Sequence, residues 1–377
     1  MNKYIIQGYK DGDYPQIRVY RMNSDLKGVG KMIATRMGDG SRTEMSIDDI
    51  KRDIENATND AADRAGVAPL SKEDQDHLLE IICRKGRFVG VEAGKELVLT
   101  YDEGSVKLMR LGISIGRIQD LQMYERCFAS DTAELAHVDY SFKPTKSIIH
   151  EEQSTMEQAQ LVTTLPLFYG AMPNMALYSY PDGPSANPIE LLPKGKIKEA
   201  QQAYEESIEL MVHDLVFTSS KMYEAGADGI NFDTTGSAGD ADFYATLKAT
   251  EILKKKYPNI CIEMGMAGEF VLGMHGNLFY DGVKLAGLYP HEQVKIAQKA
   301  GVTIFGPVVN INSSHTFPYD ITRAITMCKA CTEASDIPIH ANMGMGVGGI
   351  PIVDTPPIDA LSRSSVAMAE IAKVDGL

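Results

Sequence analysis

The strongest constraint on the fold is an alternation of strand, loop and helix that starts near residue 135 and continues to the last residue. The helical segments carry apolar residues on one face, as Ile208, Met211 and Leu215 do at three- and four-residue steps. Short apolar segments between them predict strands at 136–142, 161–170, 228–234, 259–265, 301–310 and 337–344. Strands that alternate with amphipathic helices are typical of a parallel sheet covered by helices.

The number of strands points to a particular fold class. Six strands are visible, and VDGL (374–377) begins a seventh, whereas a closed (β/α)8 barrel needs eight. An open doubly wound sheet can end with six or seven strands, but it would not naturally end after a single strand residue. The sequence therefore predicts an α/β protein with a (β/α)8 TIM-type barrel that is truncated in its seventh strand.

The region before the alternation has a different pattern. We expect residues 1–31 to be an N-terminal extension, 32–134 to form a mixed helical and β region, and 135–377 to form the incomplete barrel. Ser46 is expected to cap a first helix. Ser71 is expected to cap a second helix, which Gly86 would end.

The composition excludes some classes of partner and location. A net charge of −14 argues against nucleic acid and anionic membranes, which bind clustered Lys and Arg. No apolar run approaches the roughly 18 residues of a membrane span, and the N-terminus has no signal peptide. Five irregularly spaced cysteines are typical of reduced thiols. We therefore expect a cytoplasmic protein that binds neither nucleic acid nor membrane.

Candidate functional residues lie where the expected strands end, because barrels place their active sites at the C-terminal ends of strands. These positions carry acids, amides and histidines. The catalytic candidates are Glu263, Asp233 and His340, and the candidates for substrate binding are Tyr169, Asn231, Asn310, Asn342 and Glu269. No metal site is expected among them.

For several of the acids and histidines a structural role has to be weighed against a functional one. Glu263 follows an apolar strand and enters a Gly-rich loop, where a carboxylate is usually paired or functional, and the same argument applies to Asp233. A buried histidine whose hydrogen bonds are satisfied is an equally good interpretation of His340. Asp240 and Asp242 follow the Asp233 strand, and capping the next helix is the better interpretation of both.

Several longer strings carry a resemblance to a known family. LFYGAMPNM, ADGINFDTT, AGDADFY, EMGMAGEFVLGMHGNLFYDGV and MGMGVGGIPIVDTPPIDA together resemble the dimethylamine–corrinoid protein methyltransferase family of methylamine metabolism, from about Arg36 to Leu377. In that family VDG and an aliphatic residue come directly before pyrrolysine. The resemblance thus implies pyrrolysine at the position after Leu377, with further chain beyond it.

The resemblance also implies a reaction and a partner. A methyl group of dimethylamine would pass to Co(I) of a separate corrinoid protein and release monomethylamine, as in methanogenesis. The resemblance implies that the corrinoid is carried by the partner, which agrees with the absence of a D-x-H-x-x-G cobalt-ligand motif from this sequence. A homo-oligomer is expected. Two alternatives stay open, namely a self-contained TIM-barrel lyase and a truncated homologue that only binds amine or the corrinoid partner.

Overall fold

The computed structural model describes residues 32–86, 89, 168–171, 173, 175–273, 276–353 and 356–377. The strands are β1 (Met32–Arg36), β2 (Arg42–Ser46), β3 (Phe168–Ala171), β4 (Gly229–Thr235), β5 (Cys261–Met266), β6 (Phe279–Tyr280), β7 (Val283–Lys284) and β8 (Ile304–Gly306). The α-helices are α1 (Ile47–Ala65), α2 (Lys72–Cys83), α6 (Pro188–Leu191), α7 (Ile197–Glu224), α8 (Asp240–Lys256), α9 (Pro290–Ala300), α10 (Phe317–Glu333) and α11 (Ile358–Ala367). The expected extension 1–31 and the expected strand 136–142 lie outside the described residues.

The first helix begins and ends where its sequence predicts. The side chain of Ser46 accepts a hydrogen bond from the backbone N–H of Asp49, at 3.1 Å, and so satisfies a donor that the first helical turn leaves open. Gly66 closes α1 in the left-handed conformation that glycine adopts without strain. The predicted cap at Ser46 is confirmed.

The second helix begins as predicted but ends early. Ser71 caps α2, as expected, by accepting from the N–H of Asp74. The helix stops at Cys83, before the expected end at Gly86. Arg84 leaves the helical conformation, with a ψ of 134°, and the guanidinium of Arg363 donates to the carbonyl groups of Ile82, Arg84 and Gly86 at this end.

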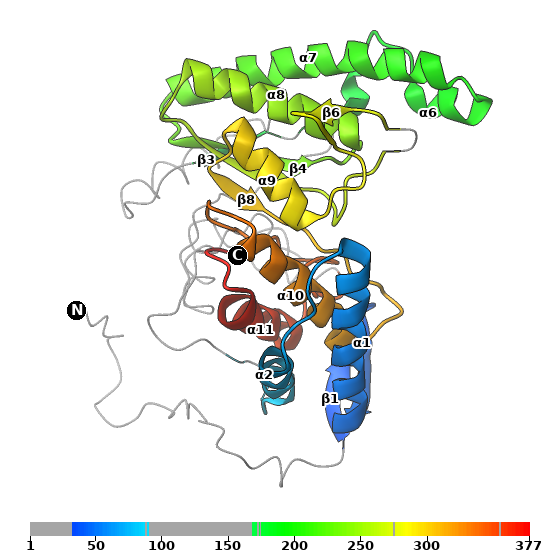
Figure 1. Ribbon diagram of the computed structural model, residues 1–377, viewed down its shortest axis with the longest axis vertical. Helices are drawn as coiled ribbons and strands as arrows, with labels where there is room; N and C mark the ends of the chain where they lie inside the picture. Colours follow the sequence, from blue (N-terminus) through cyan, green and yellow to red (C-terminus); the bar gives the residue numbers. More distant parts are fainter. Residues whose placement is uncertain are drawn as a thin grey trace, which may run out of the picture.

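The central sheet is parallel and follows the order of the chain. Its strands lie in the order β3–β4–β5–β8. Single parallel bridges continue this order from Phe305 to Ile339 and from His340 to Gly376. Helices α7, α8, α9 and α10 connect the successive strands, and each packs beside the next (Figure 1). The α/β class with a parallel sheet is therefore confirmed.

Two strands are shorter than the sequence pattern predicted. The expected strand 301–310 is reduced to β8, which stops at Gly306 because Pro307 has no N–H to continue the ladder. The expected strand 337–344 forms no regular strand, but it pairs through bridges at Ile339 and His340 and through backbone hydrogen bonds at Pro338, Ala341 and Asn342. The apolar runs in both places correctly mark buried backbone, but they overestimate the length of regular pairing.

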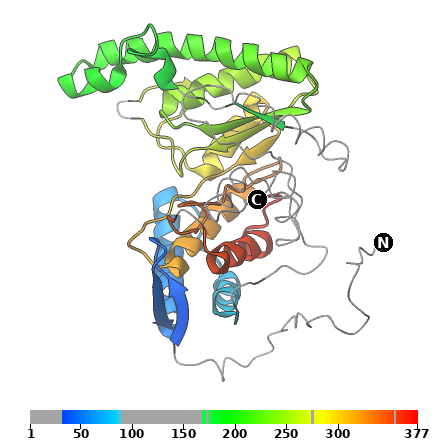
Figure 2. The ribbon, with the colours of Figure 1, turned by 180° about the vertical axis from the view of Figure 1, so that it is seen from behind.

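The N-terminal hairpin and helices pack against the C-terminal helices. In both views α1 and α2 lie beside α10 and α11 (Figure 1, Figure 2). Thr326 of α10 donates to Thr58 of α1 at 3.0 Å, and Lys329 of α10 contacts Asp74 of α2 at 2.5 Å. Residues 32–83 thus form a layer that packs on α10 and α11. In the described ranges no helix is long and apolar enough to cross a lipid bilayer.

Candidate active site

One face of the parallel sheet is polar where the strands approach their carboxyl ends. Successive side chains of a strand point to opposite faces. Phe232 and Met264 are fully buried in the core shared with the helices. On the other face Asn231 of β4 pairs in register with Glu263 of β5, and both are buried. Asp233, two residues beyond Asn231, continues this polar row and is half-buried.

The Glu263 carboxylate contacts a histidine from a distant part of the chain. Its Oε1 is paired with Nδ1 of His340, and the two side chains are 10% and 15% exposed. The backbone N–H of His340 donates to Phe305 of β8 at 2.9 Å, and the residue also bridges to Gly376. A carboxylate on one ring nitrogen fixes the orientation of the imidazole. A pair of this kind can hold or move a proton and offset a positive charge.

Asp233 lies at an irregular strand end. The pairing of β4 with β5 shifts register between Phe232 and Thr235. Thr234 there has a φ of 54°, and its N–H donates to Oδ1 of Asp233 at 2.8 Å. A Cβ on the adjacent Gly265 would lie 3.3 Å from Oδ1 of Asp233. Glycine at this position therefore leaves room for the Asp233 carboxylate on the polar face.

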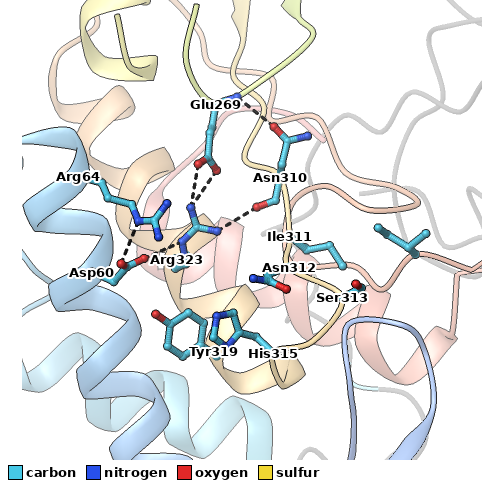
Figure 3. Close-up of a pocket in the computed structure, with 11 residues that line it drawn as sticks. Asp60, Arg64, Glu269, Asn310, Ile311, Asn312, Ser313, His315, Tyr319 and Arg323 are labelled. Atoms are coloured by element: carbon cyan, nitrogen blue, oxygen red, sulfur yellow. Dashed lines mark hydrogen bonds and ion pairs between the residues drawn. The ribbon is translucent and has the colours of Figure 1, made fainter. Parts of the chain in front are cut away.

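Glu269 and Asn310 form a second group on the loops that follow β5 and β8. Glu269 is bound at both oxygens by Nη2 of Arg323, at 2.9 and 3.0 Å, and its backbone N–H donates to Oδ1 of Asn310 at 3.2 Å (Figure 3). A polar cavity of about 350 Å³ adjoins this group, walled by α1, α10 and residues 310–315. Sequence reasoning missed Arg323, because nothing in the helical pattern of α10 marks which polar residue is buried.

The structure gives less information about the two remaining candidates, Asn342 and Tyr169. Asn342 is exposed, and its backbone N–H donates to Pro307 at 3.0 Å. Tyr169 lies in β3 and pairs in register with Ile230, but its side chain is outside the described part of the chain. Among the residues that the structure describes, no three His, Cys, Asp or Glu side chains gather in a way that could hold a metal ion.

Asp242 organises the loop between β4 and α8. It lies in the first turn of α8, and its Oδ2 accepts from the Ser237 hydroxyl at 3.0 Å and from the Ala238 N–H at 3.1 Å. Complete burial raises the pKa of this carboxyl to about 7, although the N–H and O–H donors oppose the shift. These contacts agree with a structural role at the helix start.

The raised pKa of Asp242 predicts a loss of stability with rising pH. The folded state holds the proton more tightly than the unfolded chain, so the contribution is fully present below about pH 4 and lost as pH rises through 7. At about 1.4 kcal/mol per pKa unit, the loss by pH 8 is at most about 4 kcal/mol. Asp242→Asn should reduce, but not abolish, the fall of the urea-unfolding free energy between pH 5 and 8, because burial also raises the pKa of Asp320 to about 7.

The exposed Asp39 offers a control for this measurement. Its pKa is lowered by hydrogen bonds from Ser41, so it is already ionised across the measured range. Asp39→Asn should leave the pH dependence of the free energy of unfolding as in the wild type. Equal slopes for the wild type and Asp242→Asn would contradict the assignment.

A comparison with known families accords with this geometry. The family model described as dimethylamine methyltransferase matches residues 31–377 of the chain. The matched range contains the polar sheet face, the Glu263–His340 pair and the loops that carry Glu269 and Asn310.

Proposed function

The chain belongs to the dimethylamine methyltransferase family, and from this membership we propose that it moves a methyl group from dimethylamine to Co(I) of a corrinoid carried by a separate protein. Monomethylamine is the second product. The observation that carries the proposal is the Glu263–His340 pair on the polar face of the sheet, beside Asn231 and Asp233. A cationic substrate at this face would meet carboxylates and an imidazole within a largely buried setting.

The proposal includes a barrel architecture. In a (β/α)8 barrel each strand pairs with the next one in the chain, and the helices all lie outside. The order β3–β4–β5–β8, continued by the bridges to Ile339 and from His340 to Gly376, follows this rule. We therefore propose that the parallel sheet is part of such a barrel, with the polar face of β4 and β5 turned inward.

The reaction needs a good leaving group and a fixed geometry. Amines of this kind have a pKa of about 10, as Lys does, so the substrate arrives as a cation. Displacement by Co(I) breaks the C–N bond and leaves the electron pair on nitrogen, which is easier when that nitrogen is protonated or otherwise positively charged. In the proposal Glu263 offsets this charge, His340 holds and moves the proton, and Asn231 and Asp233 orient the amine.

The position after Leu377 is part of the proposal. Pyrrolysine there would supply an electrophilic imine carbon to which the amine nitrogen could add once the ammonium proton had passed through the Glu263–His340 pair to the imine nitrogen. The bridge between Gly376 and His340 supports this, because it places the last described residues next to the Glu263–His340 pair. Leu377 itself is buried, which keeps this segment against the sheet.

The test is methyl transfer by protein purified from its native host. Dimethylamine and the reduced corrinoid protein should yield methylcobalt, seen by its absorbance, and one monomethylamine per methyl group. A spectrum of the peptide that contains Leu377 should show the mass of pyrrolysine at the next position. Folded protein that leaves dimethylamine unchanged in this assay would reject the proposed function. A different residue after Leu377 would reject the imine chemistry alone.

A further inference from the structure

Arg323 of α10 reaches two loops that leave neighbouring strands of the sheet. Its side chain is only 7% exposed. Nη2 binds both carboxylate oxygens of Glu269, and Nη1 donates to the backbone carbonyl of Asn310 at 3.1 Å (Figure 3). Glu269 follows β5, and Asn310 follows β8. One guanidinium therefore joins both loops from the side of α10.

The two loops are also joined to each other at this point. The backbone N–H of Glu269 donates to the side-chain oxygen of Asn310 at 3.2 Å. A Cβ on Gly268 would lie 3.5 Å from the same oxygen, so the loops are in close contact. With Arg323 they form a closed arrangement in which neither loop can shift without losing a hydrogen bond.

The guanidinium is itself held from the outer layer. Nε of Arg323 lies 3.3 Å from Oδ2 of Asp60 in α1, and Oδ1 of Asp60 accepts from Nε of Arg64 at 2.9 Å. This series of charges connects α1 through α10 to the loops at the carboxyl edge of the sheet. Asp60 thus balances the charge of the Arg323 guanidinium from the side of α1, without a hydrogen bond to Nε.

A buried ion pair of this kind is poorly explained by stability alone. Removing two charges from water costs several kcal/mol per ion, and apolar residues of similar volume often replace such a pair without loss. What apolar residues cannot supply is the planar fork, which fixes a carboxylate and a carbonyl in one geometry. The interaction therefore sets the positions of the loops more than it sets the free energy of unfolding.

We propose that Arg323 is a positioning residue for the reaction: it holds the β5 and β8 loops, through Glu269 and Asn310, at the carboxyl ends of the strands whose polar face carries the Glu263–His340 pair. The proposal rests on the proposed methyl transfer, because the loops border the site where that reaction is placed. It assigns no contact between Arg323 and the substrate. Its effect should appear in turnover and in the mobility of the loops.

The test compares Arg323→Lys with the wild type, both produced in the native host. Lysine keeps a positive charge beside Glu269 but cannot bind Glu269 and Asn310 together. Hydrogen–deuterium exchange of peptides covering 267–273 and 307–313 should increase. The kcat for methyl transfer should fall about 10- to 100-fold, as expected for small misplacements near a reacting centre. The KM for dimethylamine and the urea midpoint should stay close to those of the wild type.

Arg36 provides a matched control. Its Nε and Nη2 donate to the two carboxylate oxygens of Asp359 at 2.7 and 2.9 Å, and its Nη1 donates to the backbone carbonyl of Gly40 at 3.0 Å. It joins β1 to α11 and not the two loops. Arg36→Lys should leave the exchange of both loop peptides and the kcat as in the wild type.

A second variant keeps the test decisive if Arg323→Lys folds poorly. The double substitution Arg323→Met with Glu269→Met removes both charges and leaves neither buried without its partner. It should fold, with increased exchange in both loops and low kcat. Wild-type exchange and kcat in either variant would overturn the proposal. If the exchange increases but the wild type transfers no methyl group, the loop contact stands while its role in methyl transfer and the proposed function both fail.

Discussion

Glu263→Gln is expected to lower kcat/KM for methyl transfer about 10²- to 10⁴-fold, the range for loss of a positioned acid–base group. Glutamine preserves the shape of the side chain and its contact with Nδ1 of His340, but it carries no negative charge. The substrate cation then loses the counter-charge of Glu263, although the Asp233 carboxylate remains, and the imidazole of His340 loses its charged partner. Steady-state kinetics with dimethylamine and the reduced corrinoid protein measure the effect.

The same variant should remain folded. A neutral amide removes the cost of burying the Glu263 carboxylate, which is largely excluded from water. The free energy of unfolding should therefore be unchanged or slightly higher. His340→Asn should also lower kcat/KM. The double variant should lose little more than the worse of the two single variants, because residues that act as a unit are not additive.

A second His–Glu pair in the molecule serves as the control. His77 of α2 contacts Glu370 through Nε2 at 2.8 Å, in the layer that joins the N-terminal and C-terminal helices. Glu370→Gln should leave methyl transfer as in the wild type. If Glu263→Gln also retained wild-type turnover, the site would have to be placed elsewhere on the sheet.

The sequence predicted the type and position of most elements, because local signals determine them. The caps at Ser46 and Ser71 are contacts between residues three apart, and both appear in the structure. The expected strands 228–234 and 259–265 correspond closely to β4 and β5. The expected strands 301–310 and 337–344 were too long, since apolar composition reports burial but not whether each backbone N–H can pair.

The sequence predicts which residues make up the polar face, but it does not predict which of them contact one another. Alternation along β4 and β5 places Asn231, Asp233 and Glu263 on one side, and the structure agrees. The pairing of Glu263 with His340 joins residues 77 positions apart, so it depends on the strand order of the whole sheet. Their catalytic role, and the roles of the other candidates, stay predictions.

Buried arginines were the main omission. Arg323 and Arg363 both lie in helices whose apolar stripes gave no indication that an arginine would be enclosed. Glu269 shows the consequence: its role in substrate binding stays a prediction, but the ion pair of its carboxylate with Arg323 was not anticipated. A helical pattern reveals the side that is buried, but it does not reveal a cation whose partners come from three other segments.

Arg363→Met is expected to lower the free energy of unfolding by about 1 to 3 kcal/mol, the cost of leaving one buried acceptor, the Ile82 carbonyl, without its side-chain donor. The guanidinium donates to four backbone carbonyl groups, those of Ile82 at 3.2 Å, Arg84 at 2.6 Å, Gly86 at 2.9 Å and Asp359 at 3.0 Å. Methionine fills a similar volume but donates nothing. Urea unfolding followed by circular dichroism at neutral pH measures the loss.

Burial lowers the pKa of Arg363, and the nearby Asp359 carboxylate opposes this shift. The cost of burying the charged guanidinium is therefore offset mainly by its hydrogen bonds to the carbonyl groups at the end of α2. Arg363→Lys should recover part of the stability, since an ammonium reaches fewer of these carbonyl groups at once. The exposed Arg52, which pairs with Asp49 in α1, is the control, and Arg52→Met should cost little.

At low urea concentrations the effect of Arg363→Met should be confined to the region around α2, before the whole protein unfolds. Arg363 joins the end of α2 to α11, and α11 leads through the π-helix Met368–Ala372 to the segment that bridges His340. Hydrogen exchange in α2 should therefore increase at urea concentrations that leave β4 and β5 protected. An unchanged free energy of unfolding would mean that water replaces the guanidinium at these carbonyl groups, and that the other contacts of the N-terminal layer with α10 and α11 are enough to hold it.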